Sequence, residues 1–317
     1  MKFKDIFDLG IELGMDADPR GRAAAEKVMA DAAAAYEKAG ERERRFFDTG
    51  LLRNPYGDSR ILSGDPEAEI RRMLVGIDMD LPEMLMAQQL NAAGAGIDLI
   101  MSHHPRGIAL ENLPQVMELL PGSFSKCGMR LNEAQSLLAP KKEEVALSVG
   151  SGNYHRTVDA ATLLGINMMC MHTPCDNQVN TYLTRLFAEN CPDTLDDILD
   201  LLMDQGEYAV AAGRNNPPVI AVGSGGTSAG KIFVDMTGGA EGPAEYYSLL
   251  AQNGVSTVVC MAIGHEMLKT AADARLNVVV AGHMASDSLG VNLYLDKLES
   301  KGVDIMATSG LIRFSRN

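Results

Sequence analysis

From residue 73 onward the chain alternates short apolar runs with segments of helical periodicity, and this alternation constrains the fold more than any other feature. Apolar runs at 73–79 and 98–102 flank a helical segment at 82–93 that begins with a proline. Short apolar runs that alternate with helices are typical of β-α-β units. The pattern therefore predicts an α/β fold with mostly parallel sheets.

The same rhythm continues to the C-terminus, and the first part of the chain differs from it. Ile6, Leu9 and Leu13 keep helical spacing and 22–39 is rich in Ala, so we expect an N-terminal helical extension. The further expected elements are a strand at 166–171, helices at 179–188 and 195–203, strands at 219–222, 231–236, 255–261 and 278–281, helices from Pro243 and near His265, and a last helix and strand ending near Ala307.

A turn-rich segment at 213–218 divides this pattern into two parts that repeat the same β-α-β rhythm. A chain of 317 residues is long enough for two compact units. We therefore expect N-terminal helices and a first α/β lobe within 1–212, and a second α/β lobe within 213–317.

Composition excludes several classes of function. The formal net charge of −14 disfavours nucleic acid as a partner, because phosphate neutralisation needs clustered Lys and Arg. No apolar run approaches the roughly 18 residues of a membrane span, and the first residues do not resemble a signal peptide. The five cysteines include no Cys-x-x-Cys pair, which fits a reducing compartment, so we expect a cytoplasmic protein.

Two adjacent histidines, His103 and His104, follow the apolar run at 98–102 and precede Pro105. They are expected at the carboxyl edge of the sheet, where open α/β folds bind ligands. Successive strand residues point to opposite sides, so the pair is expected to serve two neighbouring ions rather than to chelate one. The alternative is two histidines in a polar turn.

Two further motifs also follow apolar strands. His283 and Asp287 lie four residues apart, and on a helix they would share the face needed to bind a metal. Asp176, which follows His172 and Cys175, is a candidate ligand that could bridge two ions. A helix cap at Asp287 and a simple turn around Asp176 are the alternatives.

A glycine-rich segment at 225–231 has the spacing Gly-x-x-x-x-Gly-Lys but does not form a P-loop. A P-loop needs Ser or Thr next and then a helix, whereas Ile232 follows here within an expected strand. Close backbone packing between the two lobes is the favoured use of this turn, and binding of a substrate phosphate or carboxylate by its backbone N–H groups is the alternative.

The motifs together resemble those of the Nif-three-like dinuclear-metal family, also called type-2 GTP cyclohydrolase I. The resemblance begins near residue 47 and covers most of the chain after it. It is carried by the segments 48–51, 64–67, 75–78, 97–105, 172–180, 222–226 and 282–287.

The resemblance implies two similar α/β lobes with a metal site in the cleft between them, and assembly into a ring-like homohexamer. Carried over by position, it implies that His103, His104, Asp176, His283 and Asp287 bind metal. Imidazole and carboxylate ligands suit two divalent transition-metal ions per chain, Zn, Fe, Mn or Co, better than Ca.

Three departures from the family pattern affect these expectations. Asp287 stands where the family usually has Glu, so its ion is expected to be held more weakly or displaced. The segment 106–152, between the family-like parts 47–105 and 166–205, is expected to be an insertion that covers or remodels the cleft. His265 lies in a stretch that replaces the family's Thr-Gly-Glu, and is a candidate proton donor or a surface helix start.

The sequence thus favours a dinuclear metal-dependent hydrolase that activates water against a small substrate, and the family resemblance suggests a nucleotide and a GTP cyclohydrolase-like ring opening. The alternative from another class is a non-enzymatic metal-binding scaffold or regulatory protein that acts through protein contacts. An α/β binding protein without metal ranks last, because it leaves the placement of the histidines to coincidence.

Overall fold

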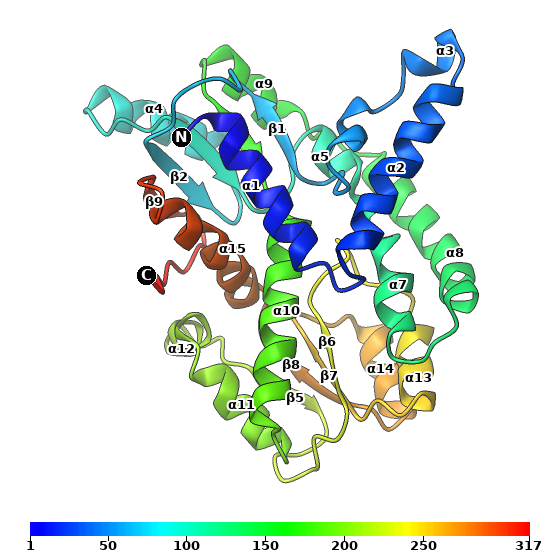
Figure 1. Ribbon diagram of the computed structural model, residues 1–317. Coiled ribbons are helices and arrows are strands. Elements are labelled where there is room, and N and C mark those ends of the chain that lie inside the picture. The colour runs from blue at the N-terminus through cyan, green and yellow to red at the C-terminus, as the bar shows by residue number, and fades with distance from the viewer.

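The computed structural model describes residues 1–317, and two β-sheets lie on either side of the long helix α10 (Thr173–Asn190) (Figure 1). The first sheet has the strand order β1-β4-β3-β2-β9, and the second has the order β5-β8-β7-β6. Neighbouring strands are parallel except for β1 with β4 and β5 with β8. This architecture confirms the predicted α/β class with mostly parallel sheets.

The strands are short, as their apolar runs predict. They are β1 (Arg60–Ser63), β2 (Arg72–Gly76), β3 (Leu99–Ser102), β4 (Met168–Cys170), β5 (Val219–Val222), β6 (Ile232–Asp235), β7 (Thr257–Cys260), β8 (Asn277–Val280) and β9 (Asp304–Thr308).

Helices precede, connect and cover these strands. Besides α10 they are α1 (Phe3–Asp16), α2 (Arg22–Lys38), α3 (Glu41–Arg44), the 3-10 helix η1 (Thr49–Leu52), α4 (Leu81–Ala92), α5 (Ile108–Glu111), α6 (Leu113–Val116), α7 (Leu119–Ser125), α8 (Leu131–Val149), α9 (Arg156–Leu163), α11 (Leu195–Met203), α12 (Gly206–Gly213), α13 (Glu245–Gln252), α14 (His265–Asp273) and α15 (His283–Glu299).

The inner strands β2, β3 and β4 of the first sheet are buried on both faces, which explains why they are mostly apolar. One face packs against α1 and α15, where Phe3, Ile6 and Tyr294 join the core. The other face packs against α4 and α9 through Met84 and Ala161. The N-terminal helix α1 is therefore part of the core of this lobe rather than an appendage.

The second sheet is covered on one face by α10, α11, α12 and α15. On the other face α13 and α14 pack together with α7 and α8, which come from the segment 106–152. Phe124 of α7 lies between Phe233 and Tyr246, with ring centroids 4.8 and 4.5 Å away. The segment 106–152, which was expected to be an insertion, follows a strand of the first lobe in sequence. In the structure it completes the core of the second lobe.

The two central helices approach each other closely at Gly290 of α15. A Cβ atom at this position would lie 2.3 Å from the carbonyl oxygen of Cys175 in α10. Only glycine fits such a contact without displacing backbone. The contact brings the N-terminal turns of α10 and α15 together, and both turns carry predicted metal ligands.

The glycine-rich turn at 223–227 packs against the start of α11. The backbone N–H groups of Leu195 and Asp196 donate to the carbonyl oxygens of Thr227 and Gly225, each at 3.0 Å. The turn therefore packs through its backbone against a helix that covers the second sheet, and the expected packing between the two lobes stays a prediction.

The structure differs from the sequence-based division at the C-terminus. Strand β9 does not join the second sheet, although it lies within 213–317, but pairs with β2 of the first sheet from Arg72–Asp304 to Gly76–Thr308. Without β9 the buried, apolar strand β2 would be an open edge, which proteins avoid. The chain therefore returns to the first lobe through α15.

Two local differences have simple causes. Helix α10 begins at Thr173, six residues before the expected helix at 179, because Pro174 occupies its first turn, where the missing N–H costs nothing. Strand β1 was not expected, and it pairs antiparallel with β4 across only four residues of mixed polarity.

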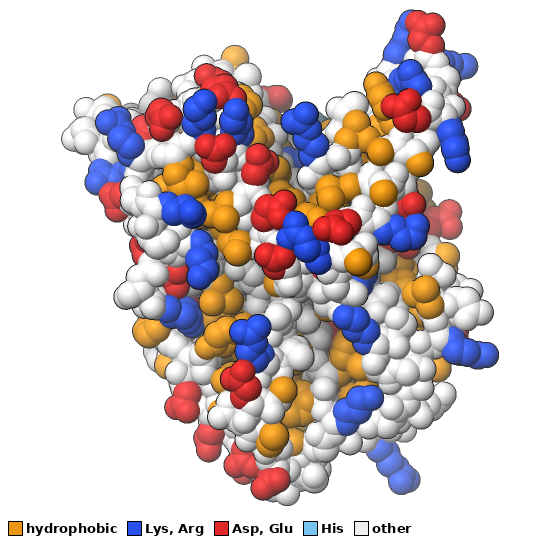
Figure 2. Space-filling view, viewed as in Figure 1, with side chains coloured by type: hydrophobic (Ala, Val, Ile, Leu, Met, Phe, Trp, Pro, Cys, Tyr) orange, Lys and Arg blue, Asp and Glu red, His pale blue; other side chains and the backbone are white.

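Acidic and basic side chains are interspersed over much of the face in Figure 2, and acidic groups gather at its lower edge near α11. Asp196 and Asp200 are exposed on that helix. None of the helices has the length and apolar character required to span a membrane.

Candidate metal centre

The candidate ligands come from the ends of two neighbouring strands and the starts of two helices. His103 and His104 directly follow β3, and His172 follows β4 at the start of α10. Because β3 and β4 are parallel neighbours, their carboxyl ends meet at one edge of the sheet. The close contact of α15 with α10 brings His283 and Asp287 to the same edge.

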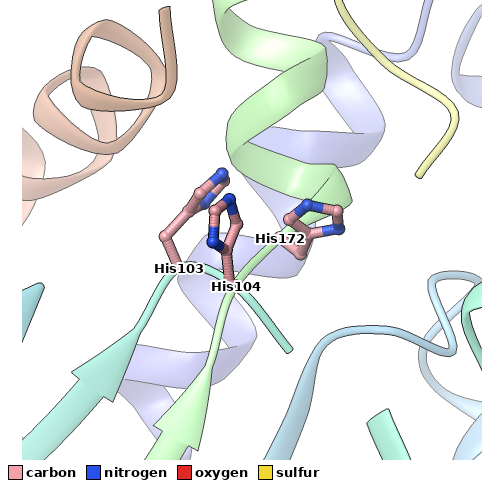
Figure 3. A group of neighbouring side chains, drawn as sticks. All are labelled: His103, His104 and His172. Atoms are coloured by element: carbon pink, nitrogen blue, oxygen red, sulfur yellow. The ribbon is translucent and has the colours of Figure 1, made fainter. Parts of the chain in front are cut away.

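Figure 3 shows that the rings of His103, His104 and His172 gather at this edge. The ring centroids of His103 and His104 are 5.3 Å apart, and those of His103 and His172 are 4.9 Å apart. The expectation that the adjacent histidines point to opposite sides is wrong, because the strand ends at Ser102 and the chain bends at both histidines. Each ring nevertheless faces a different set of carboxylate oxygens.

Asp287 lies between two groups of ligands and presents one oxygen to each. Its Oδ1 is 3.5 Å from Nε2 of His103, which also lies 3.4 Å from Oδ1 of Asp176. Its Oδ2 is 3.3 Å from Nε2 of His104 and 3.4 Å from Nε2 of His283. A carboxylate in this position can bridge two ions, although its side chain is one methylene shorter than Glu.

His172 joins the first of these groups, with its Nε2 3.7 Å from Oδ2 of Asp176. The pairs His172–Asp176 and His283–Asp287 are both four residues apart at the start of a helix. This spacing puts each histidine above its aspartate on one helix face.

The outer nitrogens of three histidines are fixed by oxygen atoms. Nδ1 of His103 donates to the carbonyl oxygen of Met171 at 3.0 Å. Nδ1 of His104 donates to Asp78 at 2.9 Å, and Nδ1 of His172 donates to Asp58 at 2.8 Å. With the proton on Nδ1, the inner Nε2 keeps its lone pair and faces the cluster, which is the arrangement of histidines that bind metals.

Four buried polar atoms at the centre of the cluster have no hydrogen-bond partner. They are Nε2 of His103, Oδ1 of Asp176 and both carboxylate oxygens of Asp287. Asp176 is 4 % exposed and Asp287 is 1 % exposed, so water does not solvate these charges. Because unpaired buried polar atoms are rare and costly, the cluster fits a group that is absent from the polypeptide.

The ionisation of the cluster indicates that this group is a cation. Burial alone would lower the pKa of His103, but Asp287 and Asp176 raise it well above 6.5. Burial alone would raise the pKa of Asp287. The nearby His103 and His104 outweigh burial and hold this pKa well below its ordinary range. The site attracts positive charge, and divalent ions would supply it in place of protons.

A cavity of about 190 Å³ adjoins the cluster. His172, Asp176, His283 and Asp287 lie on its wall and are continuous with the cluster. The rest of the wall comes from the end of β6, the loop at 236–242, the end of β7 and helices α13 and α14. A small molecule in this cavity would therefore contact the candidate ligands directly.

The structure brings together all five side chains predicted to bind metal and adds His172. The ligand atoms form three overlapping sets, and within each set all atoms lie within 4.8 Å of one another. The sets are His103, His104 and His172; His104, His283 and Asp287; and His103, Asp176 and Asp287. His172 could have been identified from its position four residues before Asp176. The roles of Asp58 and Asp78 had no local signal, because their partners are distant in sequence.

His265 lies apart from this cluster. It is the exposed first residue of α14 and belongs neither to the ligand sets nor to the cavity wall, so its role as a proton donor stays a prediction.

Comparisons with known proteins agree with the fold. The structure is similar to a NIF3 superfamily protein from Sphaerobacter thermophilus, with a TM-score of 0.70 and 29% identity, covering 80% of this chain and 92% of that one. It also matches reduced HcgD from Methanocaldococcus jannaschii (TM-score 0.49, 14% identity, 78% and 87% covered) and a Bacillus cereus protein related to NIF3 (TM-score 0.43, 13% identity, 79% and 91% covered).

No family model matches the sequence, and no curated protein does either. The similarity to the Sphaerobacter protein spans both lobes, and the three motifs that carry the predicted ligands meet in one buried cluster. The chain therefore has the fold of the NIF3 superfamily.

Proposed function

We propose that this protein is a dinuclear metal-dependent hydrolase whose ions lie in the cluster of His103, His104, His172, Asp176, His283 and Asp287. The observation that carries the proposal is the set of four buried, unpartnered ligand atoms on His103, Asp176 and Asp287. A purely structural network of buried charges would pair these atoms with one another or with the backbone.

The geometry supports two neighbouring ions rather than one. His103 lies near Oδ1 of Asp287 and near Asp176, which His172 also approaches, whereas His104 and His283 lie near Oδ2 of Asp287. The mixture of imidazole nitrogens and carboxylate oxygens favours Zn, Fe, Mn or Co.

The two ions would lower the pKa of a shared water and stabilise negative charge on the attacked group. The chain's own residues hold the ligands in place for this chemistry. Asp58 and Asp78 fix the rings of His172 and His104 through Nδ1, and the carbonyl group of Met171 fixes the ring of His103. The buried core behind His103 excludes bulk water from that side of the site.

The second candidate is a metal-binding scaffold that acts through protein contacts. A structural site is saturated by protein ligands, whereas a catalytic site keeps an open position. Here the side chain of His283 is 47% exposed, and Asp176 and Asp287 open onto the cavity. This access favours the hydrolase.

The family resemblance adds three further parts to the proposal. They are a nucleotide substrate, a GTP cyclohydrolase-like ring opening and assembly into a homohexamer.

The test is hydrolysis of a panel of small cyclic amides, amidines and nucleotides, GTP included, by protein reconstituted with Zn, Mn, Fe or Co. We expect activity that is lost on chelation, restored by metal and lost in His103→Ala. The exposed His155, which pairs with Glu111, provides the matched control His155→Ala, and this variant should retain activity. Activity that survives both chelation and His103→Ala contradicts the proposal, and metal binding without activity on any substrate supports the scaffold.

A further inference from the structure

The cavity beside the cluster contains a carboxylate that the proposed metal chemistry does not use. Asp235 ends β6 and lies on the cavity wall, where Tyr247 donates its O–H to Oδ2 of Asp235 at 3.1 Å. Oδ1 of Asp235 has no hydrogen-bond partner in the protein. One oxygen of this carboxylate is therefore free to accept a hydrogen bond from a bound molecule.

The other carboxylate outside the cluster, Glu241, is already engaged. It accepts the backbone N–H of Gly264, the residue that precedes α14, and so ties the loop at 236–242 to the start of that helix. Asp235 is thus the one carboxylate of the cavity that is neither part of the ligand cluster nor committed to the backbone.

The charge of the wall limits what can bind there. Of the 16 lining residues, four are Asp or Glu and none is Lys or Arg. Two divalent ions would carry four positive charges against the two negative charges of Asp176 and Asp287, whereas no Lys or Arg of the wall pairs with Asp235. An anionic group would be repelled by Asp235, whereas an N–H donor or a cation would be attracted to it.

The size and surface of the cavity add a second constraint. A cavity of 150 Å³ in another protein holds benzene, so a volume of about 190 Å³ accommodates one ring and a small polar substituent. Met236, Met261 and Met267 provide an apolar, adaptable wall for the ring.

We propose that Asp235 is the substrate-specificity residue of this site and that it anchors a small, ring-sized molecule through a cationic or N–H-rich group such as an amine, amidine or guanidine. Tyr247 holds the anchor in place. The opposite part of the molecule would then reach the cluster of candidate ligands. The inference deepens the proposed function and rests on it in one respect, because the bound molecule is a substrate only if the protein is a hydrolase.

The test is isothermal titration of the metal-loaded protein with benzamidine, a cationic ring, and with benzoate, its anionic counterpart. We expect benzamidine to bind and Asp235→Asn to weaken its binding at least tenfold. Glu241→Gln is the matched control within the same cavity and should change benzamidine binding less than threefold. Tyr247→Phe keeps Asp235 and removes its support, so it should weaken binding by an intermediate factor.

Repeating the titration after chelation separates this inference from the proposed function. Benzamidine binding that depends on Asp235 with and without metal supports the anchor even if no hydrolysis is found. No benzamidine binding, equal binding by Asp235→Asn and the unchanged protein, or tighter binding of benzoate in the chelated protein overturns the inference. Metal content measured in Asp235→Asn should equal that of the unchanged protein, which shows that the site itself is intact.

Discussion

Gly290 of α15 and Cys175 of α10 are in backbone contact, with 2.3 Å between the carbonyl oxygen of Cys175 and the place where a Cβ of residue 290 would be. Asp176 lies next to Cys175, and Asp287 lies one helical turn before Gly290. The contact therefore sets the separation of the two carboxylates that face His103.

Replacing Gly290 by alanine should disturb both folding and metal binding. The added methyl group meets backbone that cannot rotate away, and we expect a loss of about 1–3 kcal/mol in the free energy of unfolding. We also expect weaker metal binding, because α15 must move away from α10. Gly213→Ala is the control, since nothing lies within 4 Å of its added Cβ. Denaturant unfolding and metal titration measure the two effects, and equal behaviour of both variants would refute this role of Gly290.

The orientation of His172 should depend on Asp58. Asp58 is fully buried and accepts hydrogen bonds from Nδ1 of His172 at 2.8 Å and from the hydroxyl of Thr173 at 2.7 Å. Asp58→Asn should weaken metal binding about 10–100-fold, the usual effect of losing a carboxylate behind a metal-binding histidine. Competition with a chromophoric chelator measures the affinity. The exposed Asp200→Asn is the control, and unchanged affinity in Asp58→Asn would count against His172 as a ligand.

Asp235 should make stability depend on pH. Burial raises its pKa to about 6 from an ordinary 3.8, and the hydrogen bond from Tyr247 only partly opposes this shift. The folded protein therefore binds the proton more tightly than the unfolded chain, so the contribution of Asp235 to stability falls as pH rises from about 4 to about 6.

The variant Asp235→Asn removes this dependence. Its free energy of unfolding, relative to the unchanged protein, should rise by about 1 kcal/mol or more between pH 4 and pH 7. Urea unfolding of both proteins across this range gives the difference. A constant difference, or one that falls with rising pH, would show that the fold does not raise the pKa of Asp235.

The C-terminal tail should stabilise the fold through Arg316. Both terminal nitrogens of Arg316 lie 2.7 Å from the carboxylate of Glu207, which is fully buried. Arg316→Ala leaves this buried charge unpaired and should cost about 3 kcal/mol. The double variant with Glu207→Gln should recover much of the loss. Thermal unfolding of both variants and of the unchanged protein provides the measurement, and a loss below 0.5 kcal/mol in Arg316→Ala would contradict the pairing.

Where its signals are local, the sequence indicated which side chains would lie together in the cluster. His103, His104, His283, Asp176 and Asp287 directly follow apolar strands or share a helix face, so their positions could be inferred without knowledge of the tertiary structure. The pairing of His172 with Asp58 spans 114 residues, and no local pattern connects the two. Its identification required the three-dimensional structure.

The same distinction applies to the fold. The apolar runs predicted most strands, because a strand buried on both faces needs continuous apolar sequence. They could not show that β9 leaves the second lobe and pairs with β2, because strand partners depend on tertiary contacts. The packing of Phe124 against Phe233 and Tyr246, which attaches the segment 106–152 to the second sheet, was equally beyond local patterns.

The central claim is that two ions share Asp287, and the number of ions per chain tests it most directly. Equilibrium dialysis with Zn or Mn, followed by elemental analysis, should give two ions for the unchanged protein. His283→Ala should retain one, and Asp287→Asn should retain fewer than one. Protein that binds no ions when reconstituted, or His283→Ala and Asp287→Asn variants that still bind two, would contradict the account.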